Sequence, residues 1–161
     1  MYNKGYNVKT KIILSALLVL SLTLYAEKVE VTSDSMKAEE LKKEVVFMGN
    51  VKIKQGESWL HGDKVVVHFN ENNQTNQYEA IGKVTFEFKD EKNHYKGKAQ
   101  KVTYYPLKSE YILKGKAVVN DLQNKRELKG EVVVLNMKTG HASVKGNKKK
   151  PVKFIFDVEK K

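Results

Sequence analysis

Glycines recur along the chain at a nearly constant spacing, and this repeat constrains the fold more than any other feature. The first series has intervals of 33, 33 and 31 residues and consists of Gly49, Gly82, Gly115 and Gly146. The second series has intervals of 35 and 33 residues and consists of Gly62, Gly97 and Gly130. The flanking residues repeat with the glycines. A period of this length is typical of folds that stack one supersecondary unit on the next.

Apolar and polar residues alternate around each glycine, as they do in β-strands. After a first-series glycine the apolar residues stand two and four positions on, as Val51 and Ile53 do. In the second series, Leu60 stands two positions before Gly62 and Val65 three positions after it. A regular strand would place Leu60 and Val65 on opposite faces. We therefore predict a β-bulge near each second-series glycine. Gln100 stands three positions after Gly97, as Val65 does after Gly62, so the same rule places Gln100 on the inward face.

Turn-forming segments separate the predicted strands and support an all-β fold of antiparallel strands. These segments are residues 70–76, 89–93, 106–109 and 138–140. Residues 37–44 could form one helical turn, but we expect a polar hairpin that joins strands at 29–31 and 45–47. Since no helical heptad follows in the body, stacked strand pairs are expected to form a folded-over sheet.

The first 26 residues are typical of a secretory signal peptide. Three lysines precede IILSALLVLSLTL, an uncharged run of thirteen residues, and Ala26 offers a small residue for cleavage. A retained membrane anchor is the alternative, although the run is shorter than the roughly 20 residues that span a bilayer. The expected organisation is a signal peptide at 1–26, a β-body at 27–144 and a lysine-rich segment at 145–161 that holds a last strand at about 151–158.

Most of the net positive charge that remains without residues 1–26 lies near the C-terminus. The net charge is +11, and it would be +8 without residues 1–26; residues 145–161 alone contribute +5. A solvated lysine surface explains most of these charges, and attraction to anionic lipid head groups is the functional alternative. Binding of nucleic acid is not expected, because Arg126 is the only arginine and aromatic residues do not interleave with the basic tail.

Catalysis and metal binding find little support in the sequence. The chain has no cysteine, and the histidines at positions 61, 68, 94 and 141 have no HxxxH or HExxH spacing. No carboxylate cluster or GxSxG motif accompanies them. We therefore expect no catalytic residue, no metal site, no cofactor and no enzymatic activity.

The inward-facing row of apolar residues has two possible roles. It could fill an ordinary core, or two sheets could stand apart and leave an open apolar groove. The terminal strands raise a similar choice: their edges could pair with further copies, or the lysines at 148–150 and 160–161 could protect them. Val152, Phe154, Phe156 and Val158 share one face of the last strand.

Four segments and their order resemble the OstA-like family of lipopolysaccharide transport proteins. The segment 47–69, FMGNVKIKQGESWLHGDKVVVHF, carries the family's GNV strand, polar turn and DKVVV strand. The opening VEVTSDSM at 29–36 is similar to the family's first strand, and GKVTF at 82–86 and LKGKAVV at 113–119 are similar to its later repeats. The resemblance covers residues 29–158.

The resemblance implies a twisted β-jellyroll of two antiparallel sheets in a V shape, located in the periplasm. It implies that the lipid A acyl chains of lipopolysaccharide bind in the apolar groove. Copies would join head to tail and join an LptC-like inner-membrane protein and an LptD-like outer-membrane protein, forming a bridge for export to the outer membrane. Two alternatives stay open: an LptC-like component that keeps its membrane anchor, and a structural β-repeat protein without a lipid ligand.

The alternation of inward-facing and outward-facing residues along the strands, together with the family resemblance, gives the candidate sites. The groove face is expected to contain Val29, Val31, Val51, Ile53, Leu60, Val65, Val67, Phe69, Val84, Phe86, Phe88, Val102, Tyr104, Leu107, Leu113, Val133 and Leu135. Head-to-tail assembly is expected to involve Val29, Val31, Phe154 and Phe156.

Overall fold

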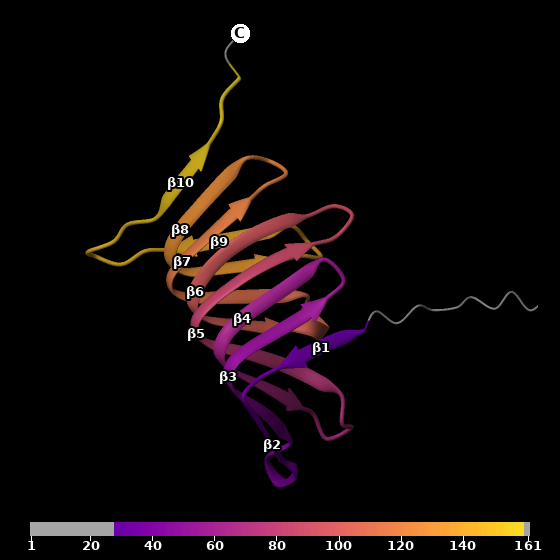
Figure 1. Cartoon of the computed structure of the whole chain (residues 1–161). Helices are drawn as coiled ribbons and strands as arrows, with labels where there is room; N and C mark the ends of the chain where they lie inside the picture. Colours follow the sequence, from indigo (N-terminus) through magenta and orange to yellow (C-terminus); the bar gives the residue numbers. More distant parts are fainter. Residues whose placement is uncertain (1–27, 160–161) are drawn as a thin grey trace, which may run out of the picture.

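The computed structural model describes residues 28–159 and consists almost entirely of antiparallel β-strands (Figure 1). The expected signal peptide lies outside the described residues. The elements are β1 (Val29–Thr32), β2 (Ser35–Glu39), the 3₁₀ helix η1 (Glu40–Lys42), β3 (Glu44–Gln55), β4 (Ser58–Phe69), β5 (Thr75–Lys89), β6 (His94–Tyr105), the 3₁₀ helix η2 (Pro106–Lys108), β7 (Glu110–Asp121), β8 (Arg126–Asn136), β9 (His141–Lys145) and β10 (Lys153–Phe156). The predicted all-β class is confirmed.

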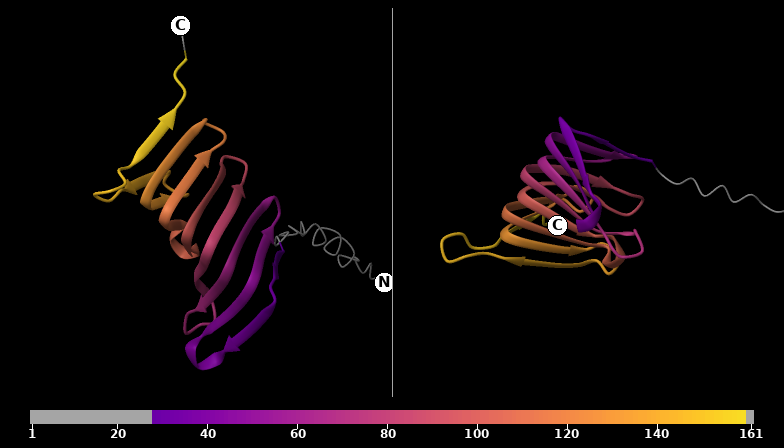
Figure 2. Two further views of the ribbon diagram at one scale, coloured as in Figure 1. Left: turned by 60° about the vertical axis from the view of Figure 1, so that its left-hand side comes forward. Right: turned by 90° about the horizontal axis from the view of Figure 1, so that it is seen from below.

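The strands pair in chain order within one sheet, and each long strand bends in its middle. The bend divides the sheet into two arms that face each other as a V (Figure 2). Arm A consists of β2, β9 and residues 44–48, 64–69, 75–81, 101–105, 110–114 and 132–136. Arm B consists of β1, β10 and residues 51–55, 58–62, 84–89, 94–99, 117–121 and 126–130. The two expected sheets are thus the two arms of one continuous sheet.

Interrupted strands form both ends of the stack. β1 and β2 both pair with β3, one in each arm, so together they act as a single broken strand. At the other end β9 and β10 pair with β8 in the same way. A hairpin is present at residues 37–44, with the single helical turn η1 at its tip, but it joins β2 to β3. The expectation that it joins residues 29–31 to 45–47 is wrong, because β1 pairs with residues 52–55 instead. Both ends of the sheet leave a strand edge without a partner among the described residues.

The bulges that create the bend lie beside the predicted positions but on the neighbouring strands. Each ladder gains its extra residue at a first-series glycine: Gly49, Gly82 or Gly115. These glycines have φ between 79° and 83°, and the residue after each also lies in the left-handed region. Glycine adopts that region without a Cβ penalty, which is why the bulge sits there rather than at Gly62, Gly97 or Gly130.

The core fills the apex of the V. Side chains near the bend, such as Val51, Val84 and Leu113, are completely buried between the arms. Leu60 and Val65 both pack into this core, as predicted despite their odd separation. Gln100 is exposed, so the expectation for it is wrong; the buried residue of that segment is Ala99. Gln100 instead lies over the Gly115 bulge, where a Cβ atom would approach its Oε1 atom.

Candidate functional site

An apolar cavity of about 340 Å³ lies between the arms in the N-terminal half of the stack. Arm B contributes β1 and parts of β3, β4 and β5, and arm A contributes parts of β3 to β7. Its lining consists of Val29, Val31, Phe47, Ile53, Gln55, Leu60, Val65, Val67, Tyr78, Ala80, Phe88, Val102, Tyr104, Pro106 and Tyr111. None of these residues carries a charged side chain, so the cavity suits an apolar ligand.

A row of aromatic rings crosses the interior from one arm to the other. Phe88 of arm B lies 4.7 Å from Tyr111 of arm A, measured between ring centroids. Tyr111 stacks on Tyr104 at 4.2 Å, and Phe86 stacks behind Phe88 at 4.7 Å. Burial raises the pKa of both the Tyr104 and the Tyr111 hydroxyl, which keeps these groups neutral at physiological pH. The rings therefore form part of an uncharged wall.

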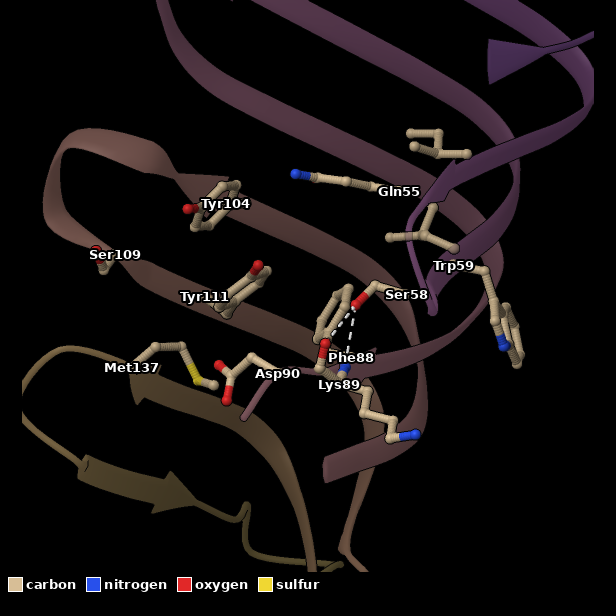
Figure 3. Close-up of a pocket in the computed structure, with 12 residues that line it drawn as sticks. Gln55, Ser58, Trp59, Phe88, Lys89, Asp90, Tyr104, Ser109, Tyr111 and Met137 are labelled. Carbon is tan, nitrogen blue, oxygen red and sulfur yellow. Dashed lines mark hydrogen bonds between the residues drawn. The ribbon is translucent and has the colours of Figure 1, made fainter. Parts of the chain in front are cut away.

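A second hollow of about 340 Å³ forms the mouth of the V, where the strand tips of the two arms stand apart (Figure 3). It shares Phe88, Tyr104 and Tyr111 with the apolar cavity, so the two spaces are continuous. Charged side chains join the lining here, because Lys89 and Asp90 border the mouth and no charged residue borders the apolar cavity. The Ser58 hydroxyl donates to the Lys89 carbonyl and accepts from its backbone N–H, at 3.2 and 3.0 Å. The interior thus becomes more polar toward solvent.

The structure places the predicted groove residues in four different settings. Nine of them line the apolar cavity: Val29, Val31, Ile53, Leu60, Val65, Val67, Phe88, Val102 and Tyr104. Six others are buried in the core without lining it: Val51, Val84, Phe86, Leu113, Val133 and Leu135. Phe69 packs against the core at the tip of β4. Leu107 is 76% exposed on η2 and lines neither the apolar cavity nor the mouth.

Six lining residues were absent from the predicted set: Phe47, Gln55, Tyr78, Ala80, Pro106 and Tyr111. Four of them could have been found by parity, because they stand two or four positions before a first-series glycine. Tyr111 is the most important of these, since it reaches across to Phe88. Pro106 follows a strand and Gln55 ends one, and neither carries a sequence signal that points to the cavity.

The residues predicted for assembly lie at opposite ends of the stack. Val29 on β1 is 52% exposed, while Val31 packs partly against the core. Phe154 and Phe156 on β10 are about half exposed, at 50% and 55%, with ring centroids 5.2 Å apart. Exposed apolar side chains on an unpaired strand edge are suited to pairing with another chain.

No acidic, basic or histidine side chain lines the apolar cavity, and one cluster of such groups lies on the outer face of arm B. Glu87 accepts a hydrogen bond from the Trp59 indole at 3.1 Å and lies 2.8 Å from His94 Nε2. Trp59 also borders the mouth, but its ring points away from the other lining residues (Figure 3). Among residues 28–159, no group of three or more His, Asp or Glu side chains could hold a metal ion. Within the same range, no helix is long and apolar enough to cross a membrane.

Comparison with known proteins identifies the family and the type of fold. A family model described as LptA/(LptD N-terminal domain) LPS transport protein matches residues 30–141. The fold is also similar to the crystal structure of LptH, described as the LptA homologous periplasmic component of the conserved lipopolysaccharide transport device from Pseudomonas aeruginosa. That match has a TM-score of 0.70 and 17% identity, and covers 82% of this chain and 96% of LptH. No curated protein matches the chain by sequence.

Proposed function

The chain belongs to the LptA/LptD N-terminal domain family of lipopolysaccharide transport proteins, and we propose that it is a periplasmic carrier that shelters lipid A acyl chains in its apolar cavity. The family match confirms the resemblance found in the sequence. The observation that supports the proposed ligand is the uncharged cavity between the arms, which opens at a more polar mouth. We also propose that residues 1–26 direct export and are then removed.

The cavity supplies what an acyl chain needs to leave a membrane. Each methylene group exposed to water costs about 0.8 kcal/mol, so an unsheltered chain cannot cross an aqueous compartment at useful rates. The apex of the V provides apolar walls, while the mouth leaves room for the sugar and phosphate groups outside. No bond is made or broken in this task, so the proposed role is carriage without catalysis. Since the lipid must move on, moderate affinity serves transport better than tight binding.

The two open ends of the stack support the second part of the proposal, which is a bridge between membranes. β1 and β2 leave one edge of the sheet open, and β9 and β10 leave the other. An LptC-like protein, an LptD-like protein or another copy of this chain could each add strands at these edges. Added strands would continue both arms and extend the sheltered path for lipid.

A pair of photo-crosslinking variants tests the proposed ligand. Leu60 lines the cavity, and its neighbour His61 is exposed on the outer face of the same strand. We expect benzoylphenylalanine at position 60 to form adducts with purified lipopolysaccharide, and the same group at position 61 to form few or none.

Adducts at both positions would indicate nonspecific contact with lipid. Adducts at neither position, in a protein with the native circular dichroism spectrum, would contradict the carrier proposal. A structural β-repeat without a lipid ligand would then be the better account.

A further inference from the structure

One row of side chains runs along the inner face of arm A, and its chemistry changes in the middle. Its members lie directly opposite one another in the ladder, strand after strand from β2 to β9: Ala38, Val45, Val67, Tyr78, Tyr104, Tyr111, Leu135 and Ala142. The three central members are tyrosines, and all the others are aliphatic. A lipid that moves along this row therefore meets hydroxyl groups only at β5, β6 and β7.

The three tyrosines, here called the tyrosine row, stand where the apolar cavity opens into the mouth. The ring centroids of Tyr78 and Tyr104 are 6.1 Å apart and those of Tyr104 and Tyr111 are 4.2 Å apart, and both pairs are stacked. All three rings line the apolar cavity, and Tyr104 and Tyr111 also line the mouth (Figure 3). Among the described residues that line the apolar cavity, Gln55 is the only other one with an amide or hydroxyl side chain.

Ring packing alone does not explain the hydroxyl groups of the tyrosine row. Phenylalanine stacks as well as tyrosine does, and Phe86 and Phe88 stack at 4.7 Å in the same interior. A hydroxyl in an apolar wall gives up hydrogen bonds to water, which is unfavourable unless polar partners replace them. Burial raises the pKa of both Tyr104 and Tyr111, so these phenols stay neutral and can both donate and accept hydrogen bonds. The row therefore suits a ligand that brings polar groups to this depth.

We infer that the tyrosine row binds the ester and amide groups that join the acyl chains of a glycolipid to its sugar. The inference rests on the proposed function, because it assumes that acyl chains occupy the apolar cavity. Ester and amide carbonyls accept hydrogen bonds from a phenol, and an amide N–H donates to one. These linkages lie between chain and sugar, as the tyrosine row lies between cavity and mouth. The row would thus fix how deeply the lipid enters, with its chains inside and its sugar outside.

The same arrangement is compatible with movement along the stack. The row continues on both sides of the tyrosines with aliphatic residues, Val67 on β4 and Leu135 on β8. One hydrogen bond contributes only about 1 kcal/mol after the exchange with water, so the contact orients the lipid without trapping it. Each copy of the protein would offer one such hydrogen-bonding station on an otherwise apolar path.

Two ligands with the same chain and different linkages test the inference. Dodecanoyl glucosamine carries an amide between chain and sugar, whereas dodecyl glucoside carries an ether, which donates no hydrogen bond. The measured quantity is the ratio of the two affinities, from calorimetric titration below the micelle concentration of each ligand. We expect Tyr78→Phe/Tyr104→Phe/Tyr111→Phe to lower this ratio, amide over ether, at least about fivefold, which corresponds to the loss of one ordinary hydrogen bond.

Tyr105→Phe is the matched control. Tyr105 follows Tyr104 on β6 and lies on the opposite face, where Lys108 Nζ is 5.5 Å from its ring centroid. It lines neither the cavity nor the mouth, so its variant should keep the affinity ratio within about twofold of the native value.

Infrared spectroscopy gives a second readout that a purely structural role would not change. The carbonyl band of bound dodecanoyl glucosamine, isotope-labelled at its amide, should lie at lower frequency in the native and Tyr105→Phe proteins than in the triple variant. If the triple variant loses the native circular dichroism spectrum, Tyr104→Phe and Tyr111→Phe are tested singly. Each of them should lower the affinity ratio at least about twofold.

Failure of the inference is distinguishable from failure of the proposed function. An unchanged ratio and an unchanged carbonyl band in folded variants, while lipopolysaccharide still reacts with benzoylphenylalanine at Leu60, would overturn the role of the tyrosine row and leave the carrier proposal standing. If the native protein binds neither ligand and lipopolysaccharide also fails to react at Leu60, the proposed function itself is contradicted.

Discussion

At the residue scale, the bend of each strand depends on a glycine in the left-handed region with an acidic or amide side chain lying over it. A Cβ atom on Gly82 would come within 2.3 Å of Asp63 Oδ2, and the same relation holds between Gly49 and Asp34. Asp34 also accepts a hydrogen bond from the Asn50 side chain at 2.9 Å, beside the first bulge. The first-series glycines are therefore required both by their φ angles and by the space around them.

This arrangement predicts different costs for alanine in the two glycine series. Gly82→Ala should lower the free energy of unfolding by about 1–2 kcal/mol from the left-handed backbone alone, with a further loss from the contact with Asp63. Gly62→Ala is the matched control, because its φ is not in that region and its Cβ would be at least 3.5 Å from other atoms. It should be neutral or stabilise the protein by up to about 1 kcal/mol.

Denaturant unfolding of the two variants and of Gly82→Ala/Asp63→Ala measures these values. The double variant should recover only the part of the loss that comes from the contact with Asp63. Equal stability of Gly82→Ala and Gly62→Ala would show that the bulge does not depend on glycine at position 82.

At the element scale, one outer-face cluster links three consecutive strands of arm B. Trp59 on β4, Glu87 on β5 and Lys96 on β6 lie directly opposite one another in the ladder. Glu87 joins the three strands, since it bonds to Trp59, lies 2.8 Å from His94 and lies 3.8 Å from Lys96. The hydrogen bond with His94, followed by that with Trp59 and the charge of Lys96, lowers the pKa of Glu87 below its usual 4.5.

A lowered carboxyl pKa predicts the pH range in which this cluster stabilises the protein. The contribution of Glu87 is fully present above pH 4.5 and is lost as the pH falls through the lower pKa of the folded state. Glu87→Gln should therefore reduce stability at pH 7 by about 1 kcal/mol and reduce the loss of stability on acidification.

Urea unfolding between pH 3 and pH 7, a range that brackets the usual carboxyl pKa of about 4, would measure this dependence. Glu57→Gln is the control, because Glu57 pairs with Lys89 at 2.6 Å while its side chain is 72% exposed. It should change stability by less than about 0.5 kcal/mol. A Glu87→Gln protein with the native acid dependence would contradict the role of the cluster.

At the scale of the whole molecule, the sequence predicted which residues face the interior of the V. It did not predict how deeply each of them is buried. The strand period correctly placed both Phe86 and Phe88 between the arms. Parity cannot distinguish them, yet Phe86 is completely buried and Phe88 lines the cavity. Depth depends on distance from the bend, and the position of the bulges was assigned to the wrong strands. The contact between Phe88 and Tyr111 was also beyond prediction, because it joins strands that are not neighbours.

The ends of the stack are arranged so that a second copy could continue both arms. β1 and β10 belong to arm B, and β2 and β9 belong to arm A. If the C-terminal edge of one copy met the N-terminal edge of the next, β10 would lie beside β1 and β9 beside β2. The inward rings of Phe154 and Phe156 would then face Val29 and Val31, and the apolar interior would run from one copy into the next.

This geometry predicts that the inner face of β10, and not its outer face, drives association. Phe154→Ser/Phe156→Ser removes two half-exposed rings and should weaken self-association at least about tenfold, because less apolar area is buried on contact. Ile155→Ser is the matched control. It lies between the two rings, points to the opposite face and is 43% exposed, so it should associate nearly as the native chain does. Sedimentation velocity over a range of protein concentrations measures the self-association of both variants.

Equal weakening by the two variants would show that β10 acts only as a strand edge. Unchanged association of the double variant would exclude the inner face of β10 from the junction, and the lysine-rich loop before it would become the surface to test.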